Sequence, residues 1–249
     1  MLLDLHYDAC SFQLDQDPGL WRTTPVAVVD GRGGVVYQAP AAAEVAELMA
    51  EVVEWLDRGD LDAHVVVRAA MAHLHVVTVH PFRDGNGRVS RITQSLVLAR
   101  DGLLSPEFAS IEEYLGTHTR DYYDQLQQAH GATYDPSRDA RDWVAFCVHA
   151  HLDQARQRLA QVEEAVKRWE RLERLADQRS WPDRFVIAME QSLFGGCDRT
   201  SYAREADVSA GTASSDLRRM VEAGLLLQTG QARATRYAPS DALRAAVAS

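Results

Sequence analysis

The stretch His80-Pro81-Phe82-Arg83-Asp84-Gly85-Asn86-Gly87-Arg88-Val89-Ser90-Arg91 decides how this chain is organised. An apolar run, Val65 to Val79, precedes it, and apolar residues at helical spacing follow it, so it predicts a loop that leads into a helix N-terminus. Free backbone N–H groups converge at a helix N-terminus and the helix dipole adds positive potential, which favours a bound anion. We therefore expect an anion-binding loop here.

The first half of this loop carries a base and a metal ligand. His80 can take a proton near neutral pH. Asp84 supplies a hard oxygen ligand of the kind that Mg²⁺ prefers when phosphate also holds the ion. Phe82 is apolar within a polar loop, and we expect it to anchor the loop to the core.

The second half carries groups that suit a phosphate. Gly85 and Gly87 permit positive φ and a close backbone approach to a phosphate, and Asn86 can donate a hydrogen bond to a phosphate oxygen. Arg88 and Arg91 lie three residues apart, on one face of the first helical turns, and each can bind a phosphate bidentately. Together these residues predict a site for attack on a nucleotide phosphate.

Simpler interpretations exist for each part of the loop. A lone His-Pro-Phe is usually a turn, Gly-Asn-Gly is usually a loop tip, and two arginines at this spacing are usually a solvated helix face. Each simple interpretation is commoner than the functional one when taken alone. All of the parts occurring in this order favour the functional interpretation.

The loop resembles the signature of Fic-domain proteins, His-x-Phe-x-(Asp/Glu)-Gly-Asn-Gly-Arg-x-x-Arg, at every fixed position. The resemblance extends over about residues 19–130: residues 19–24 look like the lead-in to the family's flap, and Tyr122-Tyr123 looks like the tyrosine pair that flanks the adenine in many members. The chain departs from the pattern at His130, where many members have Asn. The resemblance implies a mainly α fold, a Fic-type helical bundle with a β-hairpin flap.

Fic proteins mostly transfer AMP from ATP to a hydroxyl group of a target protein, so the resemblance implies a protein adenylyltransferase that uses ATP and Mg²⁺. The implied residue roles are His80 as general base, Asp84 as Mg²⁺ ligand, Asn86 with the amides of Gly85 and Gly87 at the α-phosphate, Arg88 and Arg91 on the outer phosphates, Tyr122 and Tyr123 at the adenine, and Val28 of the flap near the nucleotide. The related Doc branch transfers phosphate and has Lys at the position of Gly87. Gly87 therefore favours AMP transfer.

Fic proteins are often restrained by a helix that carries (Ser/Thr)-x-x-x-Glu-(Gly/Asn), and this motif is not found. The nearest string is Ser201-x-x-x-Glu205-Ala206, which ends in alanine. Restraint would then come from a preceding segment or a separate inhibitory partner, or the enzyme would be unrestrained.

The region before residue 150 predicts a hairpin and several helices. Thr24–Asp30 and Val35–Gln38 are β-branched runs joined by a glycine-rich turn, which predicts the flap hairpin. Residues 64–79 are rich in valine, but their alanines and the family resemblance favour a buried helix over a strand. The other helices that we expect here run from about residue 5, from 40 to 58, from 88 to 103 and from 111 to 130.

The region after residue 150 predicts a long helix and a second domain. Residues 142–178 form one helical stretch with a candidate break near His151, which either packs on the catalytic domain or forms a dimer seam. Helices over 181–193, 200–206 (capped by Thr200-Ser201) and 209–223, then strands over 225–228 and 235–238, follow the order of a winged helix-turn-helix domain. The expected domains are a Fic catalytic domain (1–150), a helical linker (151–180) and a winged helix-turn-helix domain (181–249).

DNA contact is one of two open roles for the second domain, and its neutral charge balance argues against DNA. Arg218, Arg233 and Arg236 can reach phosphates, but residues 183–249 hold eight acidic residues and eight arginines. Dimerisation or partner docking are the alternatives. Residues 1–150 carry a net charge of −11, so they do not form a nucleic-acid surface.

Other classes of site and location are disfavoured. His73, His75 and His80 invite a zinc site, but residues 73 and 75 point to different faces of a helix and no cysteine lies nearby. The chain has no long apolar run and no basic leader, so we expect no membrane span or signal peptide. Three unclustered cysteines indicate reduced thiols in the cytoplasm.

Three rival functions remain open. The protein transfers another phosphate-linked group or removes AMP, or it is a DNA-binding regulator whose Fic domain senses nucleotide, or it is one half of a toxin–antitoxin pair. Self-modification is a further expected outcome of AMP transfer.

Overall fold

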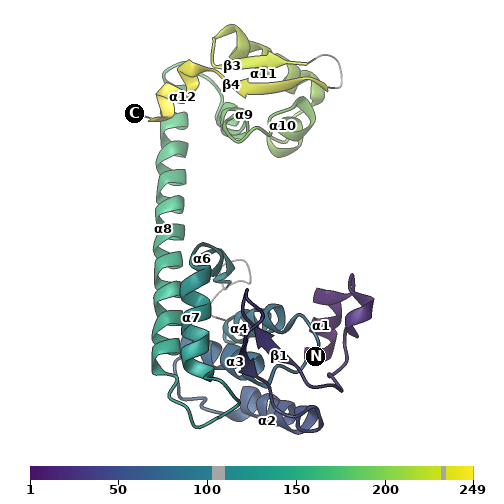
Figure 1. Ribbon diagram of the computed structural model, residues 1–249. Coiled ribbons are helices and arrows are strands. Elements are labelled where there is room, and N and C mark those ends of the chain that lie inside the picture. The colour runs from purple at the N-terminus through teal and green to yellow at the C-terminus, as the bar shows by residue number, and fades with distance from the viewer. Residues whose placement is uncertain (103–109, 231–233, 249) are drawn as a thin grey trace. The chain divides into compact units, whose positions relative to one another are not determined.

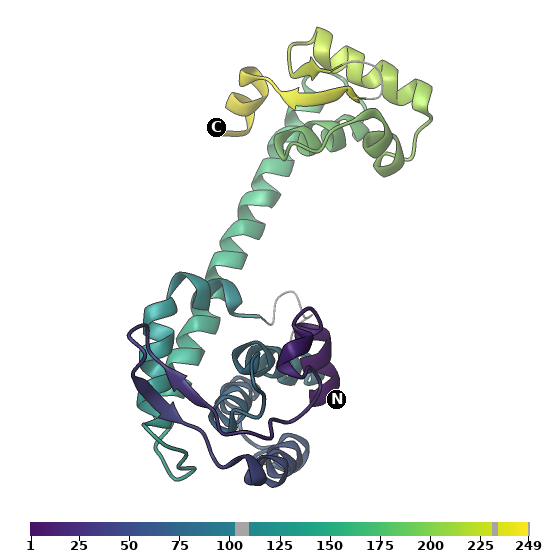
Figure 2. The same ribbon diagram turned by 45° about the vertical axis from the view of Figure 1, so that its right-hand side comes forward.

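The computed structural model describes residues 1–102, 110–230 and 234–248 of the chain. It is mostly helical, and it divides into two compact units, Met1–Arg156 and Gln157–Ser249 (Figures 1 and 2). The first unit contains α1 (Leu2–Cys10), η1 (Leu14–Gln16), β1 (Ala27–Val29), β2 (Val35–Gln38), η2 (Ala42–Glu44), α2 (Val45–Arg58), α3 (Val65–Val79), α4 (Asn86–Arg100), α6 (Glu112–Thr117), α7 (Thr119–His130) and the start of α8 (Arg141–Asp177).

The centre of the first unit is the pair α3 and α4, which lie side by side and are joined by the predicted loop. Ala69, Ala70 and Ala72 of α3 are fully buried, and their small side chains let neighbouring helices approach closely. The indole N–H of Trp143 in α8 donates to the Ala70 carbonyl oxygen at 2.8 Å, which ties α8 to this centre.

The predicted helix over the valine-rich run is confirmed. The His64 side chain accepts a hydrogen bond from the Val66 amide and caps α3, and most of the helix is buried. Tertiary packing here outweighs the strand preference of valine, because β propensity mainly measures how a side chain fits its surroundings.

The predicted hairpin is also confirmed, with a shorter first strand. β1 pairs antiparallel with β2, and the Asp30 carboxylate braces the turn by accepting bonds from the Arg32 and Gly34 amides, both at 2.8 Å. Val29 and Val35 are exposed on the hairpin. β2 also contacts α7, so the hairpin lies along one wall of the unit (Figure 2).

Two helix predictions need correction. The single helix expected over residues 111–130 is two helices, because His118 leaves the helical conformation between α6 and α7. The break considered near His151 does not occur, since α8 is one continuous helix of 37 residues that includes His151. His151 instead accepts a bond from Gln94, which keeps its ring within the packed part of the first unit.

The second unit contains the rest of α8, then α9 (Arg184–Leu193), α10 (Arg199–Glu205), α11 (Ala210–Glu222), β3 (Leu226–Thr229), β4 (Arg236–Pro239) and α12 (Asp241–Ala248). β3 and β4 form an antiparallel hairpin, so the elements follow the order expected from the sequence, with α12 in addition. The cap of α10 is Asp198 rather than Thr200 or Ser201, because its carboxylate accepts bonds from both of their amides.

A buried ion pair holds the helices of the second unit together. Arg184 of α9 donates two bonds to the Asp216 carboxylate of α11, at 2.7 and 3.1 Å, and the Tyr202 hydroxyl of α10 donates to the same carboxylate at 3.0 Å. Asp216 is nearly buried, so these donors compensate for its lost hydration. Arg218 and Arg236 are exposed, whereas Arg233 lies outside the described residues.

Candidate active site

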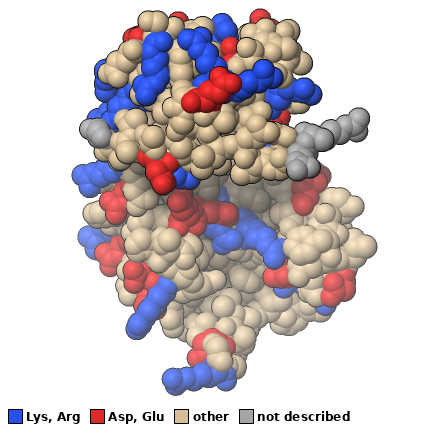
Figure 3. Space-filling view, turned by 90° about the horizontal axis from the view of Figure 1, so that it is seen from above, with Lys and Arg blue, Asp and Glu red and all other residues tan. Residues whose placement is uncertain are grey.

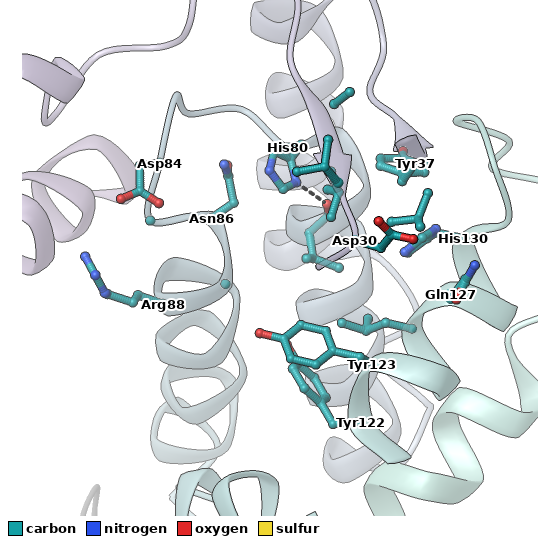
Figure 4. Close-up of a pocket in the computed structure, with 18 of the residues that line it drawn as sticks. Asp30, Tyr37, His80, Asp84, Asn86, Arg88, Tyr122, Tyr123, Gln127 and His130 are labelled. Carbon is teal, nitrogen blue, oxygen red and sulfur yellow. Dashed lines mark hydrogen bonds between the residues drawn. The ribbon is translucent and has the colours of Figure 1, made fainter. Parts of the chain in front are cut away.

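The predicted loop opens onto a cavity of about 650 Å³ in the first unit, a size that suits a small-molecule ligand (Figure 4). Its walls come from the hairpin, the end of α3, the loop with the start of α4, and α7. All ten site residues expected from the sequence line it: Val28, His80, Asp84, Gly85, Asn86, Gly87, Arg88, Arg91, Tyr122 and Tyr123.

The Asn86 side chain stabilises the turn of the loop through two hydrogen bonds to the Phe82 backbone. The Asn86 amide oxygen accepts a bond from the Phe82 amide, and the Asn86 amide nitrogen donates to the Phe82 carbonyl, both at 2.9 Å. Asn86 and Phe82 are buried, so this pair of bonds is protected from water. The side chain expected to bind phosphate thus uses both ends of its amide to brace the loop.

Gly85 is required where it stands. Its φ is +78°, in the left-handed region that favours glycine, and a Cβ there would lie 2.4 Å from the Cys10 Sγ atom. Beneath the loop, the His6 ring stacks on Phe82 at 3.7 Å between centroids, accepts a bond from the Gly19 amide, and faces the Asp84 carbonyl oxygen at 3.1 Å. His6 and Cys10 were missed by sequence reasoning, since nothing in α1 links them to the loop.

The start of α4 presents free amides to the cavity. The first N–H to bond within the helix is that of Val89, to the Gly85 carbonyl, so the amides of residues 86–88 precede the helical ladder. Three unpaired N–H groups at the N-terminus of a 15-residue helix make a good anion site. Gly87 has ordinary helical geometry, so the expected positive φ is found at Gly85 and not at Gly87. A Cβ on Gly87 would lie 3.2 Å from the Arg91 Nη1 atom, so the missing side chain leaves that guanidinium room.

His80 ends α3 in a left-handed conformation, with φ +51°. Its Nδ1 lies 3.2 Å from the Val77 carbonyl oxygen, which can only accept, so Nδ1 carries the proton and Nε2 is left as a free base (dashed line in Figure 4). Burial lowers the His80 pKa below its usual range, and the hydrogen bond to the Val77 carbonyl opposes this only in part. The imidazole is therefore neutral at pH 7 and ready to accept a proton.

Arg22 holds the position of this base. Its buried guanidinium donates to three carbonyl oxygens, those of His80 at 2.8 Å, Pro40 at 2.8 Å and Thr24 at 3.1 Å. The arginine of the lead-in segment thus ties the end of α3 to both flanks of the hairpin. Sequence reasoning found the lead-in by resemblance but assigned no role to Arg22.

The Asp84 carboxylate is exposed at the rim of the cavity, opposite α7 (Figure 4). No group of three or more metal-binding side chains occurs within residues 1–102, 110–230 and 234–248. One carboxylate beside an anion site suits Mg²⁺, which keeps several waters and takes its other ligands from substrate phosphates. The donor set fits an ion that arrives with a nucleotide.

The two loop arginines differ in their surroundings. Arg88 lies over the Phe12 ring at 5.2 Å, and its Nη1 is 3.3 Å from the Cys10 Sγ atom. Arg91 forms an ion pair with Glu112 of α6 at 2.9 Å. A carboxylate from α6, outside the predicted loop, therefore pairs with Arg91. The sequence gave no signal for this pair, because 21 residues separate its members.

The tyrosine pair is split between two environments. Tyr122 is 4% exposed, and its hydroxyl lies 3.1 Å from the His73 Nε2 atom. Tyr123 is 60% exposed and presents its ring at the cavity edge. Tyr123 is therefore the member placed to stack on a base, while the Tyr122 hydroxyl is engaged with the protein.

Gln127, His130 and Asp30 are among the further cavity-lining residues to which sequence reasoning gave no role. Gln127 and His130 follow Tyr123 at spacings of four and three on α7, so they share its face, and Asp30 faces them from the hairpin turn (Figure 4). His130 packs on Tyr37 at 4.4 Å. The helical spacing from Tyr123 was the available signal for Gln127, whereas His130 had been noted as the position where many Fic proteins have Asn.

The histidine trio considered for zinc is dispersed. His73 is fully buried between Gln94 and Tyr122, as expected for a structural histidine. His75 packs its ring edge against Trp55. Only His80 of the three reaches the cavity.

Residues 1–98 match the sequence model of a family described as the Fic/DOC family. Protein adenylyltransferase fic-1 of Caenorhabditis briggsae is 38% identical over 121 residues, which make up 47% of this chain and 23% of that protein. Protein adenylyltransferase Fic of Nematostella vectensis is 30% identical over 147 residues, which make up 58% of this chain and 30% of that protein. The chain thus spans less than a third of the length of these relatives.

A solved structure, that of a Fic family protein from Desulfovibrio desulfuricans G20, matches with a TM-score of 0.59 and 24% identity. The match covers 96% of this chain and 68% of that one, and it supports the fold described above. The predicted fold class, a mainly helical Fic-type bundle with a small hairpin, is confirmed.

The Glu112→Gln variant is expected to bind ATP more tightly than the wild type. Glu112 competes with a phosphate for the Arg91 guanidinium, and the pair is partly exposed, so the expected gain is about twofold to fivefold. Calorimetric titration with ATP measures it. Asp124→Asn, which removes one charge from a pair with Arg120, serves as control. An affinity that is equal in Glu112→Gln and wild type would show that the pair does not compete with the nucleotide.

Proposed function

We propose that this chain, whose residues 1–98 match the model of the Fic/DOC family, is a protein adenylyltransferase that transfers AMP from ATP to a Ser, Thr or Tyr hydroxyl of a target protein. The observation that carries the proposal is the free Nε2 of His80 beside a cradle of helix N-terminal amides in one cavity. A base and an anion site that share a pocket suit attack by a hydroxyl on a phosphate.

The proposed reaction begins with His80. Its Nε2 takes the proton of the target hydroxyl as the oxygen attacks the α-phosphorus of ATP. A P–O bond to the target forms, the bond to the β-phosphate oxygen breaks, and pyrophosphate leaves. The amides at the start of α4 stabilise the developing charge on the α-phosphate, and Arg88 and Arg91 bind the outer phosphates. Mg²⁺ held by Asp84 would neutralise phosphate charge when it is bound.

The hairpin is the proposed docking site for the target. β1 and β2 form a two-stranded sheet that borders the cavity, with Val28 and Val29 in its lining. An extended target segment can add to such a sheet through main-chain hydrogen bonds, which would bring its hydroxyl near His80. A loop of the same protein can dock in this way too, so self-modification is expected.

Rival activities differ in what leaves the cavity. Removal of AMP or transfer of another phosphate-linked group would use the same base and the same amides. A nucleotide-sensing regulator or a toxin component would keep the nucleotide site and differ in its target. Gly87 favours AMP transfer, since the related Doc branch, which transfers phosphate, has Lys at this position.

Location and domain limits remain part of the proposal. No helix within the described ranges is long and apolar enough to cross a bilayer. Cys10, Cys147 and Cys197 are all free and buried, which supports a reducing compartment such as the cytoplasm. We assign the catalytic domain to residues 1–150, a helical linker to 151–180 and a winged helix-turn-helix domain to 181–249.

We propose that a second copy of the chain covers the exposed apolar face of α8. Leu159, Val162, Val166 and Trp169 repeat at spacings of three and four, and they are 59%, 56%, 53% and 37% exposed. If two α8 helices packed in parallel through this face, Arg158 of each copy would reach Glu163 of the other, on the two sides of the dimer seam.

DNA is the weaker partner for the second unit. Acidic side chains stand among the Lys and Arg side chains on the face shown in Figure 3. A gel shift that weakens steeply with added salt would favour DNA contact.

Replacing His80 by alanine is expected to lower AMP transfer by about 10²–10⁴-fold while ATP binding persists. The base is lost, but the amides and arginines that hold the nucleotide remain. Intact-mass spectrometry after incubation with ATP and Mg²⁺ follows the gain of one AMP on the protein or on a target. Labelling by His80→Ala at the wild-type rate would remove His80 from the mechanism.

The transfer rate is expected to fall on the acid side with a midpoint below pH 6.5, the usual pKa of histidine. Burial lowers the His80 pKa, and Arg22 and His130 lower it further, against the opposing effects of the Val77 hydrogen bond and the Asp84 charge, so the neutral base survives to more acidic pH. The pH dependence of kcat tests this. A midpoint above 6.5 would mean that the His80 pKa is raised in the working complex.

Val162→Glu is expected to convert a dimer to a monomer, because it would bury a charge in the seam. Sedimentation velocity measures the change. Leu227→Glu, at an exposed position of β3, is the matched control. A wild type that is monomeric at high protein concentration contradicts the proposed dimer.

A further inference from the structure

We propose that Phe12 is a positioning residue, whose ring holds the Arg88 guanidinium for contact with the outer phosphates of ATP. The Cys10 thiol gives the same guanidinium a second contact, so the end of α1 becomes a supporting part of the phosphate site. The inference rests on the proposed function, since it concerns how Arg88 meets the nucleotide.

Arg88 is held by an aromatic ring and a thiol. Its guanidinium carbon lies over the Phe12 ring, 5.2 Å from the ring centre, and its Nη1 atom donates to the Cys10 Sγ atom at 3.3 Å. In the part of the chain that the structure describes, no carboxylate forms an ion pair with Arg88, whereas Arg91 pairs with Glu112 at 2.9 Å. A phosphate that approaches Arg88 therefore has no carboxylate to displace.

These two contacts leave most of the hydrogen-bond donors of Arg88 available. An aromatic ring attracts a cation through its quadrupole, and it does not need to accept one of the five N–H groups of the guanidinium. The contact with Cys10 involves Nη1 alone. The N–H groups on the other nitrogens remain for a phosphate, which arginine can bind through two of them.

Burial does not account for the position of Phe12. Its side chain is 70% exposed, so it gains little hydrophobic stabilisation where it stands. It follows α1 directly, in a turn that the Gln13 amide closes by donating to the Cys10 carbonyl oxygen at 2.9 Å. The contact with Arg88 is the interaction that this turn provides for the ring.

The helix before this turn is fixed to the loop. His6 and Cys10 lie four residues apart on the buried face of α1. The His6 ring stacks on Phe82 at 3.7 Å between centroids, and the Cys10 Sγ atom would lie 2.4 Å from a Cβ on Gly85. Phe12 is therefore held beside the start of α4, and an arginine held in advance loses less conformational freedom when it binds a phosphate.

The test compares ATP with AMP, which lacks the outer phosphates. Phe12→Leu is expected to weaken ATP binding by about twofold to fivefold, as for the loss of one exposed cation–π contact, and to leave AMP binding unchanged. Phe12→Trp should keep or raise the affinity for ATP, because the indole ring attracts cations best. Tyr7→Leu, which replaces another exposed aromatic residue of α1, should change neither affinity. Calorimetry gives the dissociation constants, and thermal melting shows that each variant is folded.

A double-mutant cycle separates positioning from a general structural effect. In the Arg88→Ala background, Phe12→Leu should cost no further ATP affinity, because the group that it positions is gone. Equal losses for ATP and AMP, full additivity with Arg88→Ala, a loss in Phe12→Trp as large as that in Phe12→Leu, or no loss at all would overturn the inference. In each of these cases Arg88→Ala alone still binds ATP weakly. If Arg88→Ala binds ATP as tightly as the wild type, the proposed phosphate role of Arg88 is itself wrong, and the inference fails with it.

Discussion

The two hydrogen bonds between the Asn86 amide and the Phe82 backbone are the constraint on which the site depends. They close the loop on itself, so the chain must reverse within four residues and enter α4 at once. The tight reversal needs the left-handed conformation of Gly85. It also buries Phe82, whose ring stacks on the His6 ring. The free amides of α4 face the cavity because these bonds hold the helix start in place.

Much of this could be predicted from the sequence. Residues 80–91 contain the glycine, the asparagine and the charged groups in one short segment, so their juxtaposition follows from chain connectivity alone. The helix over Val65–Val79 was less obvious, because valine favours strands; alanines at Ala69, Ala70 and Ala72 gave the better signal, and all three are buried against neighbouring helices. The hairpin followed from its glycine-rich turn, which Asp30 braces as such turns commonly are.

The remainder depends on contacts between distant segments, which no local pattern encodes. Glu112 and His6 reach the loop from separate helices, and their types are unremarkable for those positions. Tyr122 and Tyr123 are adjacent and chemically identical, so the sequence could not tell that one is buried against His73 while the other faces the cavity. Packing decides such differences, since successive residues of a helix lie about 100° apart around its axis.

The three hydrogen bonds that Arg22 donates tie the hairpin to the residue that carries the base. A single buried guanidinium holds the carbonyl that ends α3 and the carbonyls of Thr24 and Pro40 on either flank of the hairpin. Any pull on the hairpin by a bound strand is therefore transmitted to the residue that carries the imidazole, through bonds that resist stretching in a water-free setting. In the proposed reaction, docking of the target strand and alignment of His80 would therefore be a single cooperative event, and a strand bound in the wrong register would displace the base.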